Sequence, residues 1–248
     1  MEPYYTGDHV TVYLGDMREI LPALEVQADC IVTDPPYGET SLAWDQWPDG
    51  WPAITATVAP SMWCFGSMRM FLNHRSDFET AGWKFSQDVV WEKPNGSGFA
   101  KDRFRRVHEI ASHWYRGEWR NTHHEVPRTA AYPGQKQRDR RTDQPGHTGT
   151  IGTYVYKDDG TRLMRSVIRM PSMNGRALHP TEKPVGLLAS LIEYACPPGG
   201  TVLDPFAGSG STLDAAQQVG RHAIGIEAYE PYAEAAARRL QQAPLPAT

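Results

Sequence analysis

Apolar and polar positions along the chain predict regular strands and helices at both ends and an irregular middle. Runs of about four to eight apolar residues are typical of strands, and apolar positions three or four residues apart are typical of helices. We expect strands at 9–16, 29–34, 61–67, 84–93, 108–117, 165–172, 201–206 and 222–227. We expect helices at 17–24, 68–82, 183–196, 211–220 and 231–243. From 118 to 161 the periodicity is lost, and so long a connection is expected to be either a functional insertion or disordered.

The last third of the chain has the pattern of a nucleotide-binding fold. A strand, a glycine loop, a helix, a second strand and a final helix follow one another within about 40 residues, as in right-handed parallel units. Earlier in the chain, the run Cys30-Ile31-Val32 is apolar enough to be buried on both faces, as strands of parallel sheets are. The sequence therefore predicts an α/β protein.

Composition limits the class and the location of the protein. The 248 residues are 40% hydrophobic and 22% charged, which is ordinary for a globular protein. The three cysteines lie far apart and indicate neither a disulfide framework nor a zinc site, so we expect a cytoplasmic protein without a metal. The first ten residues lack the basic and apolar segments of a signal peptide. Without a run of about 18 apolar residues, we expect no membrane span.

Charge is distributed unevenly, although the net charge is only −4. Residues 93–169 carry 16 of the 25 Lys and Arg residues but only 8 of the 29 Asp and Glu residues. A basic block within an acidic chain indicates either a surface that binds a polyanion or a solvated loop region. On the first interpretation, the arginines expected to contact the polyanion are Arg103, Arg105, Arg106, Arg138, Arg140 and Arg141.

The glycine loop that follows the strand at 201–206 indicates a cofactor. Gly208 and Gly210 let the backbone come close to a ligand, but the third glycine of the dinucleotide fingerprint is missing. Glu227 ends the next strand, where an acid can accept hydrogen bonds from two ribose hydroxyls. Asp204 would repel a pyrophosphate but could attract an ammonium or a sulfonium group. S-adenosylmethionine therefore suits this loop, and the alternative is a purely structural glycine turn.

The stretch Asp34-Pro35-Pro36-Tyr37 suits the transfer of a methyl group to an amine. An exocyclic amine of adenine or cytosine is a poor nucleophile, and it improves when two rigidly held acceptors draw its N–H bonds out of the ring plane. Asp34 supplies a carboxylate, and the prolines hold a backbone carbonyl, most simply that of Pro35, as the second acceptor. Tyr37 supplies a flat face for a base swung out of the double helix. The alternative is a strand-ending turn with Asp34 as a local cap.

Together these motifs resemble the DNA amino-methyltransferases, which methylate adenine N6 or cytosine N4. The resemblance rests on "TDPPYG" and "LDPFAGSGST", in the order of the β-group. It implies a circularly permuted Rossmann-like methyltransferase sheet with helices on both faces. It also implies that "GDMREIL" lies near the cofactor adenine, "HPTEKPVGLL" near the methionine end and "WEKPN" beside the target base.

The resemblance extends to single residues and to the division of the chain. The implied cofactor residues are Asp16, Asp34, His179, Lys183, Asp204, Pro205, Phe206, Gly208, Gly210, Thr212 and Glu227. The implied target-side candidates are Lys93 and Asn95, beside the catalytic Asp34 to Tyr37. The implied parts are a catalytic half at 1–95, an inserted target-recognition region at 96–170 and a cofactor-binding half at 171–248.

Members of this family with Asp first in the motif mostly act on adenine, so we expect adenine-N6 methylation of double-stranded DNA, with cytosine-N4 methylation as the alternative. Carbon methylation of cytosine would need a cysteine after a proline, and the chain has no Pro-Cys pair. Protein-glutamine methyltransferases have Asn first and a different motif order. A dinucleotide oxidoreductase has no use for Asp-Pro-Pro-Tyr, and a non-catalytic DNA-binding module leaves the cofactor loop unexplained. Whether the protein is a homodimer stays open.

Overall fold

The computed structural model describes residues 1–42, 44–97, 102–130, 140–141, 155–156, 159–171 and 182–242. The chain forms two compact units, one made of Met1–Glu125 and Ser166–Thr248, the other of Val126–Arg165. The strands of the larger unit are β1 Tyr5–Gly7, β2 Val10–Leu14, β3 Cys30–Thr33, β4 Ser61–Gly66, β5 Lys84–Ser97, β6 Arg106–Tyr115, β11 Val167–Arg169, β12 Thr201–Asp204 and β13 His222–Glu227. Its helices are α1 Met17–Ala23, α2 Trp51–Thr55, α3 Met68–Thr80, the 3-10 turn Trp119–Asn121, α4 Val185–Ala195, α5 Ser211–Gln218 and α6 Glu230–Gln241.

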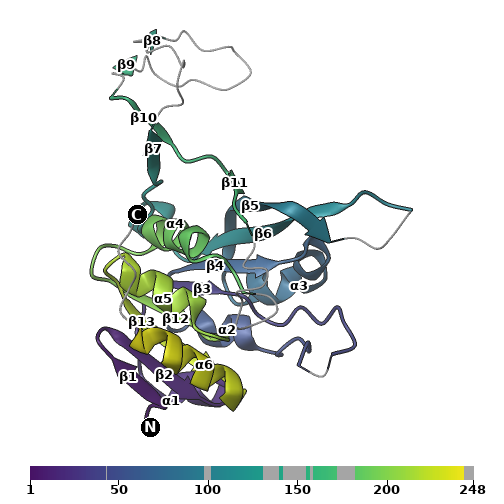
Figure 1. The fold of residues 1–248 in the computed structure, drawn as a ribbon, viewed down its shortest axis with the longest axis vertical. Helices are drawn as coiled ribbons and strands as arrows, with labels where there is room; N and C mark the ends of the chain where they lie inside the picture. The colour runs from purple at the N-terminus through teal and green to yellow at the C-terminus, as the bar shows by residue number, and fades with distance from the viewer. Residues whose placement is uncertain are drawn as a thin grey trace. The chain divides into compact units, whose positions relative to one another are not determined.

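The larger unit is built on one nine-stranded sheet with the order β1-β2-β13-β12-β3-β4-β6-β5-β11 (Figure 1). The five central strands, from β2 to β4, run parallel, whereas β6 is antiparallel to both of its neighbours. The two cofactor-side strands β12 and β13 therefore lie between β2 and β3, although they come last in the chain. This order confirms the predicted α/β class and the circular permutation.

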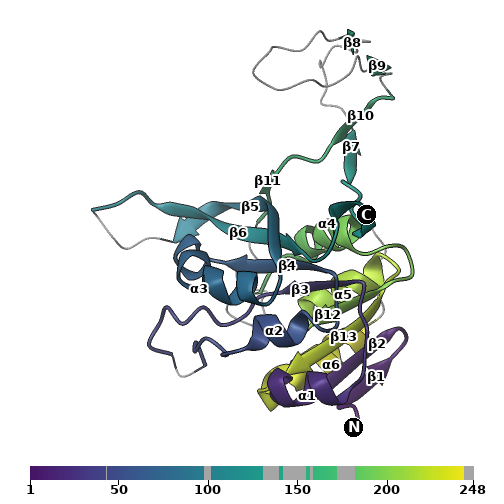
Figure 2. The same cartoon turned by 180° about the vertical axis from the view of Figure 1, so that it is seen from behind.

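Helices cover both faces of the sheet, as predicted (Figures 1 and 2). Side chains of α4, α5 and α6 pack with Cys30 and Val32 in one core cluster. Side chains of α1, α2 and α3 pack with Ile31 in the other. Successive strand residues point to opposite faces, so the run Cys30-Ile31-Val32 contributes to both clusters and all three residues are fully buried. The prediction of a strand buried on both faces is confirmed.

Most predicted elements are present, and the differences lie where the apolar pattern was weakest. β1 and α2 were not predicted, because β1 has three residues and α2 has five. α2 begins at the fully buried Trp51, which belongs to the hydrophobic core. α3 ends just before Gly82, which has a φ of 85°.

The smaller unit contains an antiparallel pair of β7 Arg128–Ala130 with β10 Thr161–Leu163, and a second pair of β8 Arg140–Arg141 with β9 Val155–Tyr156. Asp159 accepts hydrogen bonds from the backbone and the hydroxyl of Thr161 at 2.9 and 2.8 Å. This unit lies within the predicted target-recognition region, whose role stays a prediction. Over the described residues of the whole chain, none of the helices is long and apolar enough to cross a membrane.

Candidate active site

The carboxyl ends of the parallel strands open into one cavity of about 1050 Å³. Parallel sheets bind ligands at this edge, where the loops after neighbouring strands meet. Most of the residues predicted from the sequence line the cavity: Asp16, Asp34, Pro35, Pro36, Tyr37, Lys93, Arg106, Lys183, Asp204, Pro205, Phe206, Gly208, Thr212 and Glu227. The structure therefore brings the two motifs of the sequence to one place.

Other predicted residues lie elsewhere. Gly210 is not among the cavity-lining residues. Arg103 is exposed in the connection between β5 and β6, where it pairs with Asp102 at 2.9 Å, and Arg105 follows two positions later. Arg140 and Arg141 form β8 of the smaller unit. The predicted residues His179 and Arg138 lie outside the described residues, and Asn95 is placed only as part of β5.

The two glycines of the cofactor loop have different structural roles. Both adopt a positive φ, 52° at Gly208 and 80° at Gly210, which L-residues with a side chain rarely adopt. A Cβ at Gly210 would lie 2.9 Å from the Cβ of Ala236 on α6, whereas a Cβ at Gly208 would meet nothing within 4 Å. Gly210 therefore allows α6 to approach the start of α5, and Gly208 is the glycine that leaves room in the cavity.

Asp204 ends β12 as a buried carboxyl group. Its Oδ1 accepts hydrogen bonds from the Thr33 hydroxyl at 2.8 Å and from the backbone N–H of Phe206 at 3.1 Å. Burial raises the pKa of Asp204 to about 6, and the hydroxyls of Thr212 and Thr33 oppose this rise only in part. A cation that enters the cavity would therefore stabilise the ionised form of Asp204.

Glu227 ends β13 and is held by backbone donors. The N–H of Gly208 donates to its Oε2 and the N–H of Tyr229 donates to its Oε1, both at 2.8 Å. Burial raises the pKa of Glu227, against the effect of these hydrogen bonds. Each carboxylate oxygen has a second lone pair, so the group can still accept hydrogen bonds from a ligand.

Asp16 follows β2 and caps α1. Its Oδ1 accepts a hydrogen bond from the backbone N–H of Arg18 at 2.8 Å. The Arg18 guanidinium also donates to it, and this hydrogen bond lowers the pKa of Asp16. Arg18 lines the cavity too, so this end of the cavity carries a paired carboxylate rather than a free one.

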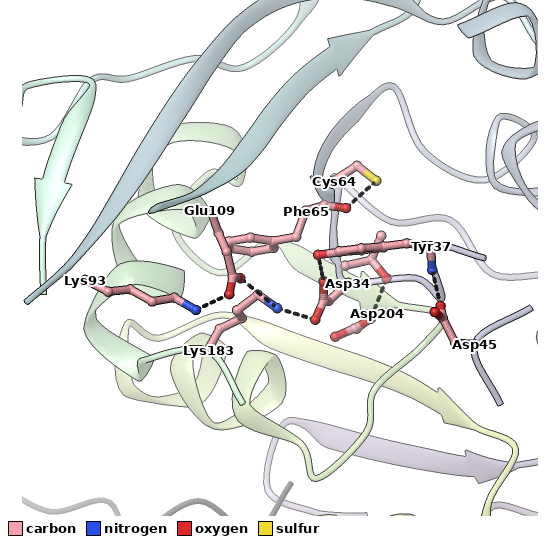
Figure 3. Close-up of polar contacts among 10 residues, drawn as sticks. Asp34, Tyr37, Asp45, Cys64, Phe65, Lys93, Glu109, Lys183 and Asp204 are labelled. Carbon is pink, nitrogen blue, oxygen red and sulfur yellow. Dashed lines mark hydrogen bonds and ion pairs between the residues drawn. The ribbon is translucent and has the colours of Figure 1, made fainter. Parts of the chain in front are cut away.

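The target side of the cavity holds a chain of alternating charges (Figure 3). Lys93 pairs with Glu109, and Lys183 pairs with both Glu109 and Asp34. The Lys183 side chain is only 6% exposed, and its Nζ lies 3.4 Å from Glu109 Oε2. Burial would lower the pKa of Lys183, but the charges of Asp34 and Glu109 outweigh it and raise that pKa. Lys183 is therefore a fixed cation beside the predicted catalytic carboxylate.

Tyr37 and Glu109 complete the surroundings of Asp34. The Tyr37 hydroxyl donates to Asp34 Oδ1 at 2.6 Å. Burial and the nearby Asp34 charge raise the Tyr37 pKa well above its usual value, so the phenol stays protonated. Burial would raise the pKa of Glu109, but Lys183 and Lys93 outweigh it and lower that pKa, so Glu109 stays ionised. Both oxygens of Asp34 are thus oriented by donors from the protein itself.

Two residues of this site were not predicted from the sequence. Glu109 lies on β6, in a strand of mixed polar and apolar residues, and an acid in the strand after Lys93 was the only sign of it. Asp45 lies in the loop after β3, is 4% exposed and binds four backbone N–H groups of that loop. Its sequence neighbourhood, "AWDQW", resembles an ordinary surface loop.

Comparison with known proteins decides the family. The profile of a family described as "DNA methylase", N6/N4 type, matches residues 28–238 of the chain. The chain belongs to the N6/N4 DNA methylase family. This confirms the resemblance that the two motifs indicated, and the protein is a DNA methyltransferase.

Individual relatives agree with this assignment. The methylase is 25% identical over 268 residues to "Type II methyltransferase M.ScaI" of Streptomyces caespitosus, covering 97% of this chain and 84% of that protein. A shorter match, 57% identical over 67 residues, covers 27% of this chain and 30% of "Putative methylase YubD" of Escherichia coli strain K12.

Solved structures have the same fold. The "M1.HpyAVI-SAM complex" is 26% identical, with a TM-score of 0.63 over 94% of this chain and 100% of that one. The cytosine-N4-specific PvuII DNA methyltransferase has a TM-score of 0.69 at 15% identity, over 98% of this chain and 90% of that one. At this identity the second likeness concerns the fold of the methylase alone.

Proposed function

We propose that this methylase transfers a methyl group from S-adenosylmethionine to the N6 amine of adenine in double-stranded DNA. The observation that supports it most is the meeting of two sites in one cavity. The Asp34-to-Tyr37 turn, which Lys183 holds, lines this cavity together with Asp204 and Glu227, which end the cofactor strands. An acceptor for the target amine thus lies in the same cavity as the residues that suit an adenosine ligand, and the charge of Asp34 contributes to the raised pKa of Asp204.

The cofactor is S-adenosylmethionine, and the residues of the cavity suit it. Asp204 and Glu227 are carboxyl groups without an ion pair among the described residues, and a ligand that carries an ammonium and a sulfonium group supplies the missing positive charge. Glu227 would accept the ribose hydroxyls, and Asp204 would lie toward the charged amino-acid end. When bound, the cofactor would supply an electrophilic methyl group and would leave as S-adenosylhomocysteine once the S–CH3 bond breaks, and the amine would release one N–H proton to solvent.

On the target side, the chain's own residues hold the amine and orient it. The carboxylate of Asp34 and the carbonyl of Pro35 are the two acceptors for its N–H bonds, which directs the nitrogen lone pair toward the methyl donor. Tyr37 offers its ring to the base while its hydroxyl holds Asp34 Oδ1 at 2.6 Å. Because Lys183 pairs with Asp34, this carboxylate does not face an uncharged base as an unpaired negative charge.

One experiment tests both the activity and the base. DNA from cells that express the parent or the Asp34→Ala variant is digested to nucleosides and analysed by mass spectrometry, and cofactor affinity is measured by calorimetry. We expect N6-methyladenine in DNA from the parent alone. Since Asp34 acts on the amine, the variant should keep cofactor affinity within about threefold while transfer falls by at least about 100-fold.

Three other outcomes contradict parts of the proposal. N4-methylcytosine in the parent sample would assign the other amine of the family. A sample without either modified base would reject transfer to DNA under these conditions. Transfer by Asp34→Ala within a few-fold of the parent would show that the Asp34 carboxylate is not the acceptor of the amine.

A further inference from the structure

The loop between β3 and α2 contains a buried carboxylate, that of Asp45, which has no role in the methyl transfer proposed for Asp34. Asp45 is 4% exposed, whereas its neighbours Trp44 and Gln46 are exposed. Burying an ionised carboxyl group is costly unless hydrogen bonds or a cation compensate for it. Asp45 therefore needs partners, and their identity indicates what it does.

The partners of Asp45 are four consecutive backbone N–H groups. Its Oδ1 accepts from Tyr37 at 2.7 Å and from Gly38 at 2.9 Å. Its Oδ2 accepts from Glu39 at 3.1 Å and from Thr40 at 2.7 Å. Burial would raise the pKa of Asp45, but the hydrogen bonds outweigh it and lower that pKa. The carboxylate thus occupies a nest of backbone donors that curls the turn around it.

This nest is connected directly to the catalytic carboxylate. Tyr37 gives its N–H to Asp45 and its hydroxyl to Asp34 Oδ1 at 2.6 Å (Figure 3). The tyrosine is therefore fixed at both ends, and the same residue holds Asp34. A shift of the backbone at Tyr37 would move the phenol, and with it one of the two donors that orient Asp34.

We propose that Asp45 is a positioning residue for methyl transfer, acting through Tyr37 on the orientation of Asp34. This inference rests on the proposed function for its effect on transfer, but the nest itself can be tested without any reaction. In the proposed function, Asp45 contacts neither the amine of the target base nor the cofactor. Its removal should therefore slow turnover and leave cofactor binding as it was.

The decisive variant is Asp45→Asn, which keeps the size of the side chain. In either orientation of the amide, its NH2 group faces two of the four N–H donors, so half of the nest is lost. We expect kcat to fall by about 100-fold, as a misplacement of about 1 Å can cause, with the Kd for S-adenosylmethionine within about threefold of the parent. Asp49→Asn is the matched control, because Asp49 is exposed in the same loop, and it should behave as the parent.

Two further measurements separate positioning from a general loss of structure. Hydrogen exchange of the amides of residues 37–40 should be slow in the parent and fast in Asp45→Asn, with α5 and β12 equally protected in both. In a double-mutant cycle with Tyr37→Phe, the two losses in kcat should not be additive, because both act on Asp34 through one residue.

Several results would overturn the inference. They are a parent-like kcat in Asp45→Asn, a rise in cofactor Kd as large as the fall in kcat, additive losses in the cycle, or unchanged exchange at residues 37–40. A parent that methylates no DNA would instead reject the proposed function, and the exchange measurement would still decide whether Asp45 holds the turn.

Discussion

The carboxylates of the cavity fall into two groups, which differ in whether lysines pair with them. On the target side, Asp34 and Glu109 share Lys183, and Lys93 binds Glu109 from its other side. On the cofactor side, Asp204 and Glu227 are held by hydroxyl and backbone donors, and in the described part of the chain neither of these two forms an ion pair. The first set is neutral overall, and the second carries negative charge with raised pKa values.

This difference corresponds to the charge of what each side is proposed to receive. A nucleobase is uncharged, so a neutral set of groups can orient its amine without leaving a charge buried and unpaired. S-adenosylmethionine brings positive charge, so carboxylates without a cation can hold it more tightly. Each subsite contains an aspartate at the carboxyl end of a parallel strand, Asp34 in one and Asp204 in the other. The two subsites differ in whether a lysine of the protein balances the charge of that aspartate.

The largest expected effect comes from removing the shared cation of the target side. In Lys183→Met, Asp34 loses its cation and faces Glu109, which keeps only Lys93, and we expect the free energy of unfolding to fall by about 3 kcal/mol. Adding Glu109→Gln should restore part of this loss, because it removes the negative charge that faces the unpaired Asp34. Denaturant unfolding at pH 7 measures both.

A surface pair provides the control for that experiment. Arg75 and Glu79 form an exposed pair on α3, and Arg75→Met should change the free energy of unfolding by only about 0.5 kcal/mol. If Lys183→Met cost no more than this, the charge chain of the target side would not be a stabilising unit.

On the cofactor side, removing a charge should raise the free energy of unfolding instead of lowering it. Burial raises the pKa of Asp204 to about 6 from 3.8, so between about pH 4 and pH 6 the native state binds more protons than the unfolded state. The contribution of this carboxyl group to the free energy of unfolding is therefore greatest at low pH and falls as the pH rises. Asp204→Asn should stabilise the protein at pH 7 by about 1–2 kcal/mol, and this gain should vanish near pH 4. Thermal unfolding at both pH values checks it.

The same carboxyl group should make cofactor binding depend on pH. An ionised Asp204 attracts the positive ligand, so the Kd of the parent for S-adenosylmethionine should rise as the pH falls below about 6. In Asp204→Asn the Kd should already be about 10- to 150-fold higher at pH 7, since a hydrogen bond to a charged group is worth about 1.5–3 kcal/mol. Calorimetry from pH 5 to pH 8 would contradict this placement of the cofactor if the two proteins gave the same curve.

The smallest effect on cofactor binding is expected from the arginines at 138, 140 and 141, which are predicted to contact DNA. Replacing Arg138, Arg140 and Arg141 with Gln should lower the slope of log affinity for DNA against log salt by about 0.9 for each phosphate that the protein no longer neutralises. The Kd for S-adenosylmethionine should stay at the parent value, because the residues proposed to hold the cofactor are found in other parts of the sequence. A triple variant with the slope and DNA affinity of the parent would show that this segment does not contact DNA.

Local patterns were sufficient for the elements and for two of the motifs. Gly208 and Gly210 were predicted because a strand, a loop and a helix follow one another there, and all three are local features. The distinct roles of the two glycines were not predictable, because the close contact of Gly210 is made with Ala236, on a helix two elements later. Glu109 was missed for a similar reason, since an acid in a strand of mixed polarity gives no sign of which cation faces it.

Patterns read along the chain were enough to predict most strands and helices, the two motifs and, through the motif order, the permuted fold. They could not predict which charged side chains meet. Lys183 lies 149 positions from Asp34 along the chain, and it reaches Asp34 because crossover connections bring the ends of parallel strands to one edge of the sheet. Likewise, Asp45 is a loop residue in the sequence, and it becomes a buried acceptor only because the turn folds four N–H groups around it. Distances and burial of this kind depend on the whole chain, so no local pattern contains them.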